Sequence, residues 1–258
     1  MILHTKIEGT GKPIVILHGL FGMLDNWNGI ARQLSTKGIA CILMDLRNHG
    51  HSPWSDEFNY HVMCEDVLET IAHLELNSYV LAGHSMGGKV ALQVAACKPA
   101  GLLGLCVMDI APRYYAPHHE HIINALYRAD VHKIKSRKEA ESNMKPFIAD
   151  NATLQFLLKN LHWKDHNTLA WRFNLDAIAR NIEEVGKSFS LENKMDTPTL
   201  FMRGENSSYI NKQDEEHIQQ LFTTVKLVTI SHAGHWLHAD QPEVVINTLE
   251  AFVNECLL

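Results

Sequence analysis

The sequence predicts a doubly wound α/β fold with a mostly parallel central sheet and one helical insertion. Two kinds of segment alternate along most of the 258 residues: short continuous apolar runs, and longer stretches with apolar residues every three or four positions. Continuous apolar runs are typical of strands buried on both faces. Their alternation with helices favours right-handed strand–helix–strand units. The alternation stops between about residues 112 and 196, where helical patches replace the strand runs.

Six apolar runs are expected to form the strands of this sheet. They are Pro13–Gly19, Ala40–Leu46, Ser78–Ser85, Leu102–Ile110, Pro198–Gly204 and Lys226–Ile230. Four apolar stripes at helical spacing lie between or after these runs. They begin near Asp25, Tyr60, Val90 and Val244. Gly38 and Pro99 then supply stop signals for the first and third of these helices.

The interruption divides the chain into two predicted parts. About 80 residues without a convincing strand are too many for a loop inside a compact domain. Helical patches such as Thr153–Leu161 and His121–Ala129 lie within it. We therefore expect an α/β core made of residues 1–111 and 197–258, with residues 112–196 forming a helical cap over the carboxyl ends of the strands.

Charge and cysteine content exclude several functional classes. The net charge is −6 and the isoelectric point is about 6.3, which argues against nucleic-acid binding and against a polybasic membrane anchor. The five cysteines are odd in number, none pairs at metal-ligand spacing, and the first residues lack the pattern of a signal peptide. We expect reduced thiols and a cytoplasmic location.

The clearest chemical signal is a serine between two glycines. "GHSMG", Gly83–Gly87, matches the G-x-S-x-G pattern, in which a sharp turn between a strand and a helix exposes a strained serine. The pattern is weak alone, but here a strand run precedes it and a helical stripe follows it. The sequence therefore predicts Ser85 as a nucleophile.

A serine hydroxyl needs a general base, and this fold places that base late in the chain. Three histidines, His232, His235 and His238, lie between the last strand run and the last helix. His235 follows Gly234 where a strand-end loop would carry it into the site, so we expect it to be the base. His232 and His238 are the alternatives.

Two carboxylates could orient that histidine. In proteins of this fold the acid commonly lies three residues beyond the glycine that ends the penultimate strand, and here that residue is Ser207, which carries no charge. Asp109 ends the strand run after the nucleophile helix, and it preserves the chain order serine, acid, histidine. We predict Asp109 as the acid, with Glu205 as the alternative.

Acyl transfer also requires N–H donors for the developing oxyanion. The pattern supplies the N–H after the nucleophile, at Met86, and one from the loop after the first strand run. In that loop, "HGLFG", the expected donor is Leu20, with Phe21 as its neighbouring option. We expect His18 to stabilise the turn.

Together these segments resemble the α/β-hydrolase superfamily. The matching pieces are "HGLFG", "DLRNHGHS", "GHSMGG", "DIAP" and "AGHWLHADQPE", spread from His18 to Glu243. More narrowly, "DIAPRYY", "WRFNL" and "GENSSYI" are similar to small bacterial YbfF-type esterases. The resemblance implies an α/β-hydrolase fold, supports an acid at Asp109, and implies a hydrolase of short- to medium-chain esters, with acyl-CoA thioesters as further substrates.

The sequence thus predicts a serine carboxylesterase that uses Ser85, His235 and Asp109 and passes through an acyl-enzyme intermediate. Its partner is a small acyl ester or thioester, and neither a cofactor nor a metal is required. A cofactor-free haloperoxidase or a C–C bond hydrolase would use the same three residues. A ligand-binding module without catalysis is the alternative from another class.

Overall fold

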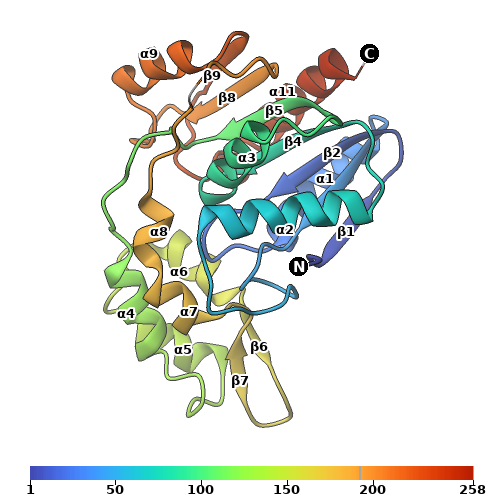
Figure 1. Ribbon diagram of the computed structural model, residues 1–258. Helices are drawn as coiled ribbons and strands as arrows, with labels where there is room; N and C mark the ends of the chain where they lie inside the picture. Colours follow the sequence, from blue (N-terminus) through green and yellow to red (C-terminus); the bar gives the residue numbers. More distant parts are fainter. Residues whose placement is uncertain (192, 258) are drawn as a thin grey trace.

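A central sheet of seven strands organises the computed structural model, which describes residues 1–191 and 193–257 (Figure 1). The strand order is β1-β3-β2-β4-β5-β8-β9. Only β1 runs antiparallel to its neighbour, while the other pairs are parallel. The strands are β1 (Thr5–Glu8), β2 (Lys12–Leu17), β3 (Ile39–Met44), β4 (Tyr79–His84), β5 (Leu102–Met108), β8 (Thr199–Gly204) and β9 (Val225–Ile230).

Both faces of the sheet are buried, which explains why its strands are continuously apolar. In β2, Ile14 and Ile16 belong to one hydrophobic core, while Val15 and Leu17 belong to the other. All four side chains are at most 1% exposed. Because successive side chains of a strand point to opposite faces, two cores require apolar residues at every position.

Helices cover the two faces of the sheet (Figure 1). Those outside the insertion are η1 (Leu24–Trp27, a 3-10 turn), α1 (Asn28–Ser35), α2 (Tyr60–His73), α3 (Met86–Ala96), α9 (Lys212–Leu221), α10 (Leu237–Asp240) and α11 (Pro242–Cys256). The apolar stripes of α2 and α3 pack into one core, and those of α1 and α11 pack into the other. The sheet is therefore doubly wound, as predicted.

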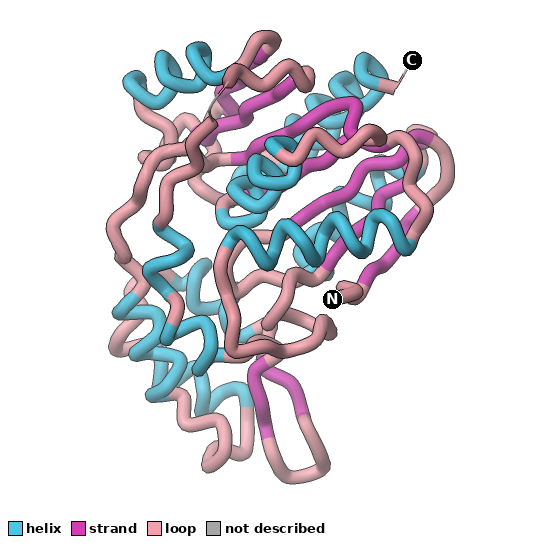
Figure 2. Tube along the Cα trace, viewed as in Figure 1, coloured by secondary structure: helices cyan, strands magenta, loops and turns pink. Residues whose placement is uncertain are grey.

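A separate layer lies between β5 and β8 in the chain. It contains α4 (Glu120–Arg128), α5 (Arg137–Met144), α6 (Asn151–Leu158), β6 (Leu161–Trp163), β7 (Leu169–Trp171), α7 (Leu175–Arg180) and α8 (Ile182–Gly186). These elements gather apart from the sheet, at the lower left of Figures 1 and 2. Short helices dominate, as expected, but β6 and β7 form an antiparallel hairpin that the sequence did not indicate.

A buried lysine joins this layer to the helix that follows the serine. Lys89, on α3, is 2% exposed, and its ammonium donates to the carbonyls of Arg113, Gly186 and Lys187. The first carbonyl lies where the chain enters the layer and the others where it leaves. Burial, reinforced by the Arg113 guanidinium, lowers the pKa of Lys89 to about 7.

The six expected strands and the four expected helices are all present, and the predicted fold is confirmed. Beyond them, the structure adds the short edge strand β1, the helix α9 and the short helix α10, for which no strand or helix was predicted. No helix within the described residues is both long and apolar enough to cross a membrane.

Candidate active site

The serine occupies a tight turn between β4 and α3. Ser85 has φ 53° and ψ −119°, a conformation that L-residues rarely adopt. The glycines beside it are required by close packing. A Cβ on Gly83 would lie 2.1 Å from the carbonyl oxygen of Gly87, and one on Gly87 would lie 2.5 Å from that of His18. The turn therefore fits its strand and helix only with glycine at both places.

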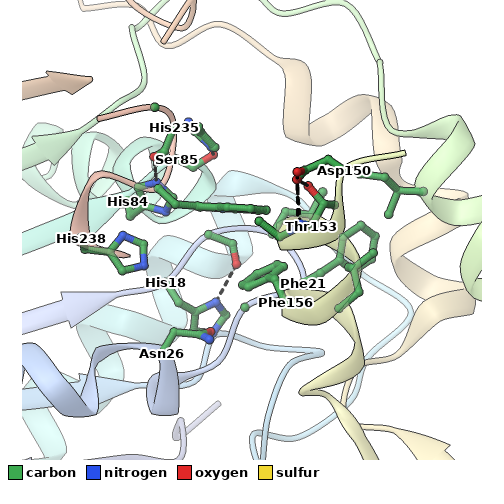
Figure 3. Close-up of a pocket in the computed structure, with 18 of the residues that line it drawn as sticks. His18, Phe21, Asn26, His84, Ser85, Asp150, Thr153, Phe156, His235 and His238 are labelled. Atoms are coloured by element: carbon green, nitrogen blue, oxygen red, sulfur yellow. Dashed lines mark hydrogen bonds between the residues drawn. The ribbon is translucent and has the colours of Figure 1, made fainter. Parts of the chain in front are cut away.

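The segments after three strands bring a serine, a histidine and an aspartate together, and Figure 3 shows the serine and the histidine, Ser85 and His235, side by side. His235, in the turn after β9, has Nε2 3.0 Å from Ser85 Oγ. Its Nδ1 lies 2.7 Å from Oδ2 of Asp109, which follows β5. The Asp109 side chain is fully buried, while a quarter of the His235 side chain is exposed. The structure thus places the three predicted residues within hydrogen-bonding distance.

Asp109 is held by two further donors. The backbone N–H of Gly204 donates to its Oδ1 over 2.9 Å, and the Ser207 hydroxyl donates to its Oδ2. Ser207 is the residue at the common position of the acid, and here it supports an acid carried by the neighbouring strand. The Glu205 carboxylate instead accepts the backbone N–H of His232 over 2.8 Å. The imidazole of His235 is therefore paired with Asp109 and not with Glu205.

Aromatic rings fix the plane of His235. Tyr209 stacks on it with ring centroids 3.9 Å apart, and His84 packs beside it at 4.7 Å. His84 Nε2 also lies 2.8 Å from the carbonyl oxygen of His235. Burial lowers the pKa of His84 far below its ordinary value and that of His238 to about 3. These two histidines are consequently neutral near pH 7.

The loop after β2 contains Leu20, the residue predicted to carry the second N–H donor. His18 holds the loop by accepting the N–H of Leu46 on Nε2 over 3.0 Å. The N–H of Phe21 is engaged, since it donates to His49 Nε2 over 3.2 Å. Leu20 lies directly before it and lines the cavity next to Ser85. Met86 is the first residue of α3, and the N–H groups of the first helical turn have no acceptor within the helix.

A cavity of about 480 Å³ opens from Ser85 between the sheet and the insertion (Figure 3). Apolar side chains form much of its wall, with Phe21 and Trp27 from the core and Ile122, Phe156 and Leu157 from α4 and α6. The insertion therefore closes one side of the site. In the described part of the chain, no three His, Cys, Asp or Glu residues gather as a metal site would require.

The sequence indicated the three central residues but not their supports. Tyr209, Lys89 and His84 received no role, although the serine motif itself contains His84. Ser207 was considered only as an acid. Its position after Gly204 could have identified it as a partner of the acid, because adjacent parallel strands end at the same edge.

Comparisons with known proteins show what the whole chain is similar to. A family model described as the α/β hydrolase fold matches residues 12–242. A Haemophilus influenzae protein named as an esterase/lipase is 38% identical over 98% of this chain and 87% of its own length. Esterase YbfF of Escherichia coli is 31% identical over 96% of this chain and 95% of its own. A solved structure titled "Marine microorganism esterase" is 39% identical, with a TM-score of 0.94 over 98% of this chain and 99% of that one.

Proposed function

The chain belongs to the α/β-hydrolase family as an esterase or lipase, and from this premise we propose that it is a serine carboxylesterase of short- to medium-chain acyl esters. Acyl-CoA thioesters are the further substrates to be tested. The observation that carries the proposal is the continuous line from Asp109 through His235 to Ser85, at the wall of a largely apolar cavity.

The first half of the reaction forms an acyl-enzyme. His235 Nε2, 3.0 Å from Ser85 Oγ, accepts the hydroxyl proton as the oxygen attacks the substrate carbonyl carbon. The N–H groups of Leu20 and Met86 stabilise the resulting oxyanion. The imidazolium then donates its proton to the leaving alcohol, and the acyl group remains on Ser85.

The second half regenerates the serine. Water loses a proton to His235 and attacks the acyl carbon, and the acid leaves after proton return to Ser85. Asp109 keeps the Nδ1 proton of His235 in place and stabilises the imidazolium in both halves. Its full burial and its bonds to Gly204 and Ser207 hold the carboxylate in one orientation.

The insertion and the cellular setting complete the proposal. Residues 112–196 act as a cap, which is supported by the contribution of α4 and α6 to the cavity wall. The five cysteines are free thiols, the ordinary state in a reducing compartment, which supports a cytoplasmic location.

Ser85→Ala provides the direct test. Wild type should hydrolyse p-nitrophenyl esters, and the variant should lose about six orders of magnitude in kcat, as comparable triads do. Because alanine removes only the hydroxyl, the circular dichroism spectrum and Tm should confirm that the variant is folded. A folded variant that retains hydrolysis would refute the assignment of Ser85.

A further inference from the structure

The cavity at Ser85 has two arms of very different size. Leu20, Ser85 and Tyr209 line both arms, so the serine lies where they meet. The large arm has a volume of about 480 Å³ and the small arm about 30 Å³. One water molecule needs about 10–15 Å³ of such space. The small arm therefore has room for about two or three heavy atoms.

The walls of the two arms contain different parts of the proposed machinery. His235 and its neighbours Gly234 and Trp236 line the large arm. The small arm is enclosed by Met86, whose N–H is an expected oxyanion donor, and by side chains that include Val185. The general acid and the oxyanion donor of α3 thus mark two different sides of the serine.

The chemistry then decides which half of an ester enters which arm. The leaving oxygen must receive a proton from His235 Nε2, so the alcohol departs on the side of the large arm. The carbonyl oxygen points to the N–H groups of Leu20 and Met86. The remaining substituent of the carbonyl carbon is the acyl chain, and it lies in the small arm.

The small arm is braced against expansion. Tyr60 donates its hydroxyl to the carbonyl of Val185 over 2.7 Å, and the Tyr115 hydroxyl accepts the N–H of Ala111 over 2.8 Å. Lys89 binds the adjacent carbonyl of Gly186 over 3.1 Å. A longer acyl chain would have to break these bonds, which hold the insertion to the core.

The large arm suits an uncharged apolar group. Phe156 and Trp236 pack against each other with centroids 5.2 Å apart, and both line the arm. The carboxylates of Asp150 and Asp240 also line it, and they disfavour an anionic leaving group.

Resting on the serine esterase proposed above, we infer that the protein prefers esters of short acids, acetyl to butyryl, with large neutral apolar alcohols. Hydrolysis breaks the bond between the acyl carbon and the alcohol oxygen. Water supplies the hydroxyl of the acid product and, in balance, the proton of the alcohol.

A pair of isomeric esters tests this preference directly. Hexyl acetate and ethyl hexanoate have the same atoms, so a difference between them reports orientation in the site and not overall hydrophobicity. Wild type should show at least a tenfold higher kcat/KM for hexyl acetate, since each methylene that does not fit a pocket costs about tenfold or more. An equal or higher value for ethyl hexanoate would overturn the inference.

A matched pair of variants tests the wall. Val185→Ala enlarges the small arm, while Val225→Ala shortens a similarly half-buried valine at the amino end of β9. Val185→Ala should raise kcat/KM for ethyl hexanoate at least threefold, because one accommodated methylene contributes about fourfold, and Val225→Ala should not. Equal values in both variants would place the acyl chain elsewhere.

p-Nitrophenyl acetate separates this inference from the function on which it rests. If wild type hydrolyses it in a Ser85-dependent manner but turns over neither isomer, the esterase stands and the preference for a large alkyl alcohol is refuted. If wild type hydrolyses no ester at all, the proposed function fails and the inference falls with it.

Discussion

Asp109→Asn tests the acid of the proposed triad, and the structure gives the size of the effect. Asp109 Oδ2 lies 2.7 Å from His235 Nδ1, which puts the centres of the two charged groups about 4 Å apart. At an effective dielectric constant near 20, opposite charges at this separation attract by about 4 kcal/mol. The side chain is fully buried, so water does not replace the lost charge.

This attraction exists only while His235 carries the proton, as it does near the transition state. Its loss should therefore lower kcat/KM by about a thousandfold, at about 1.4 kcal/mol per factor of ten. The tautomer adds to the loss, because the asparagine NH2 can face Nδ1 and drive the proton to Nε2, where the imidazole cannot act as a base. A comparable substitution in another serine hydrolase costs about 10⁴ in kcat.

Glu205→Gln is the matched control, since it also removes one carboxylate charge near the same loop. Its side chain accepts the His232 N–H, a role that the glutamine oxygen can keep. Steady-state hydrolysis of p-nitrophenyl butyrate should show near-normal kcat/KM for Glu205→Gln and at most a thousandth of it for Asp109→Asn. If Asp109→Asn stays within tenfold of wild type, or Glu205→Gln loses as much, the assignment of the acid is wrong.

Two further predictions concern stability. Gly87→Ala should abolish soluble folded protein or lower Tm strongly, because the added Cβ would lie 2.5 Å from the carbonyl oxygen of His18. Gly29 lies at an exposed position of α1 with open space around it. Gly29→Ala should therefore raise the free energy of unfolding by about 0.5–1 kcal/mol. Thermal unfolding checks both, and similar shifts would contradict the packing argument. Burial lowers the pKa of His18 from 6.5 to about 4, so between these values the unfolded chain binds more protons and stability falls as the pH falls. Urea unfolding should show that His18 lowers the free energy of unfolding by about 2 kcal/mol between pH 7 and pH 5. The His18→Gln variant should lack this part of the pH dependence, and equal pH dependence in wild type and variant would refute the prediction.

Much of the fold was predictable because burial imposes a pattern on the sequence. A strand with a core on each face must be apolar throughout, and a helix on the sheet must carry an apolar stripe. Elements that bury few side chains carry no such pattern in the sequence. The helix α9 has the sequence KQDEEHIQQL, in which Ile218 is the main buried apolar residue. The edge strand β1 is TKIE, with no fully buried side chain.

The hairpin in the insertion is a different kind of omission. Its strands β6 and β7 contain three residues each, too few to show an alternation. Trp171 is buried against Phe173 with nearly parallel rings 5.4 Å apart. Phe173 in turn packs on Phe21 of the loop after β2, with ring centroids 5.1 Å apart. That tertiary contact joins residues far apart in the chain, so the sequence of the hairpin alone does not reveal it.

Site residues were predictable where the site requires certain residues close together in the sequence. They were not predictable where it requires contacts between residues that are close only in space. The glycines around Ser85 are local requirements of a turn. Lys89 shows the opposite case, because its three acceptors lie at least 24 residues away in the chain. Nothing beside Lys89 in the sequence signals that a lysine will be buried there, or that it joins both ends of the insertion.

The position of the acid depends both on the local sequence and on which strands are neighbours in the sheet. β5 and β8 are adjacent parallel strands, so a side chain after either one reaches the same edge of the sheet. Asp109 donates its backbone N–H to Met202 on β8, while Gly204 and Ser207, beyond β8, donate to its carboxylate. The imidazole requires a carboxylate at one point in space, and the sheet offers two strand ends from which to supply it. A fixed sequence offset for the acid therefore applies only when the acid follows β8. The chain must place a carboxylate at the edge where β5 and β8 both end, and the strand end that does not carry the acid can supply a hydrogen-bond donor to it.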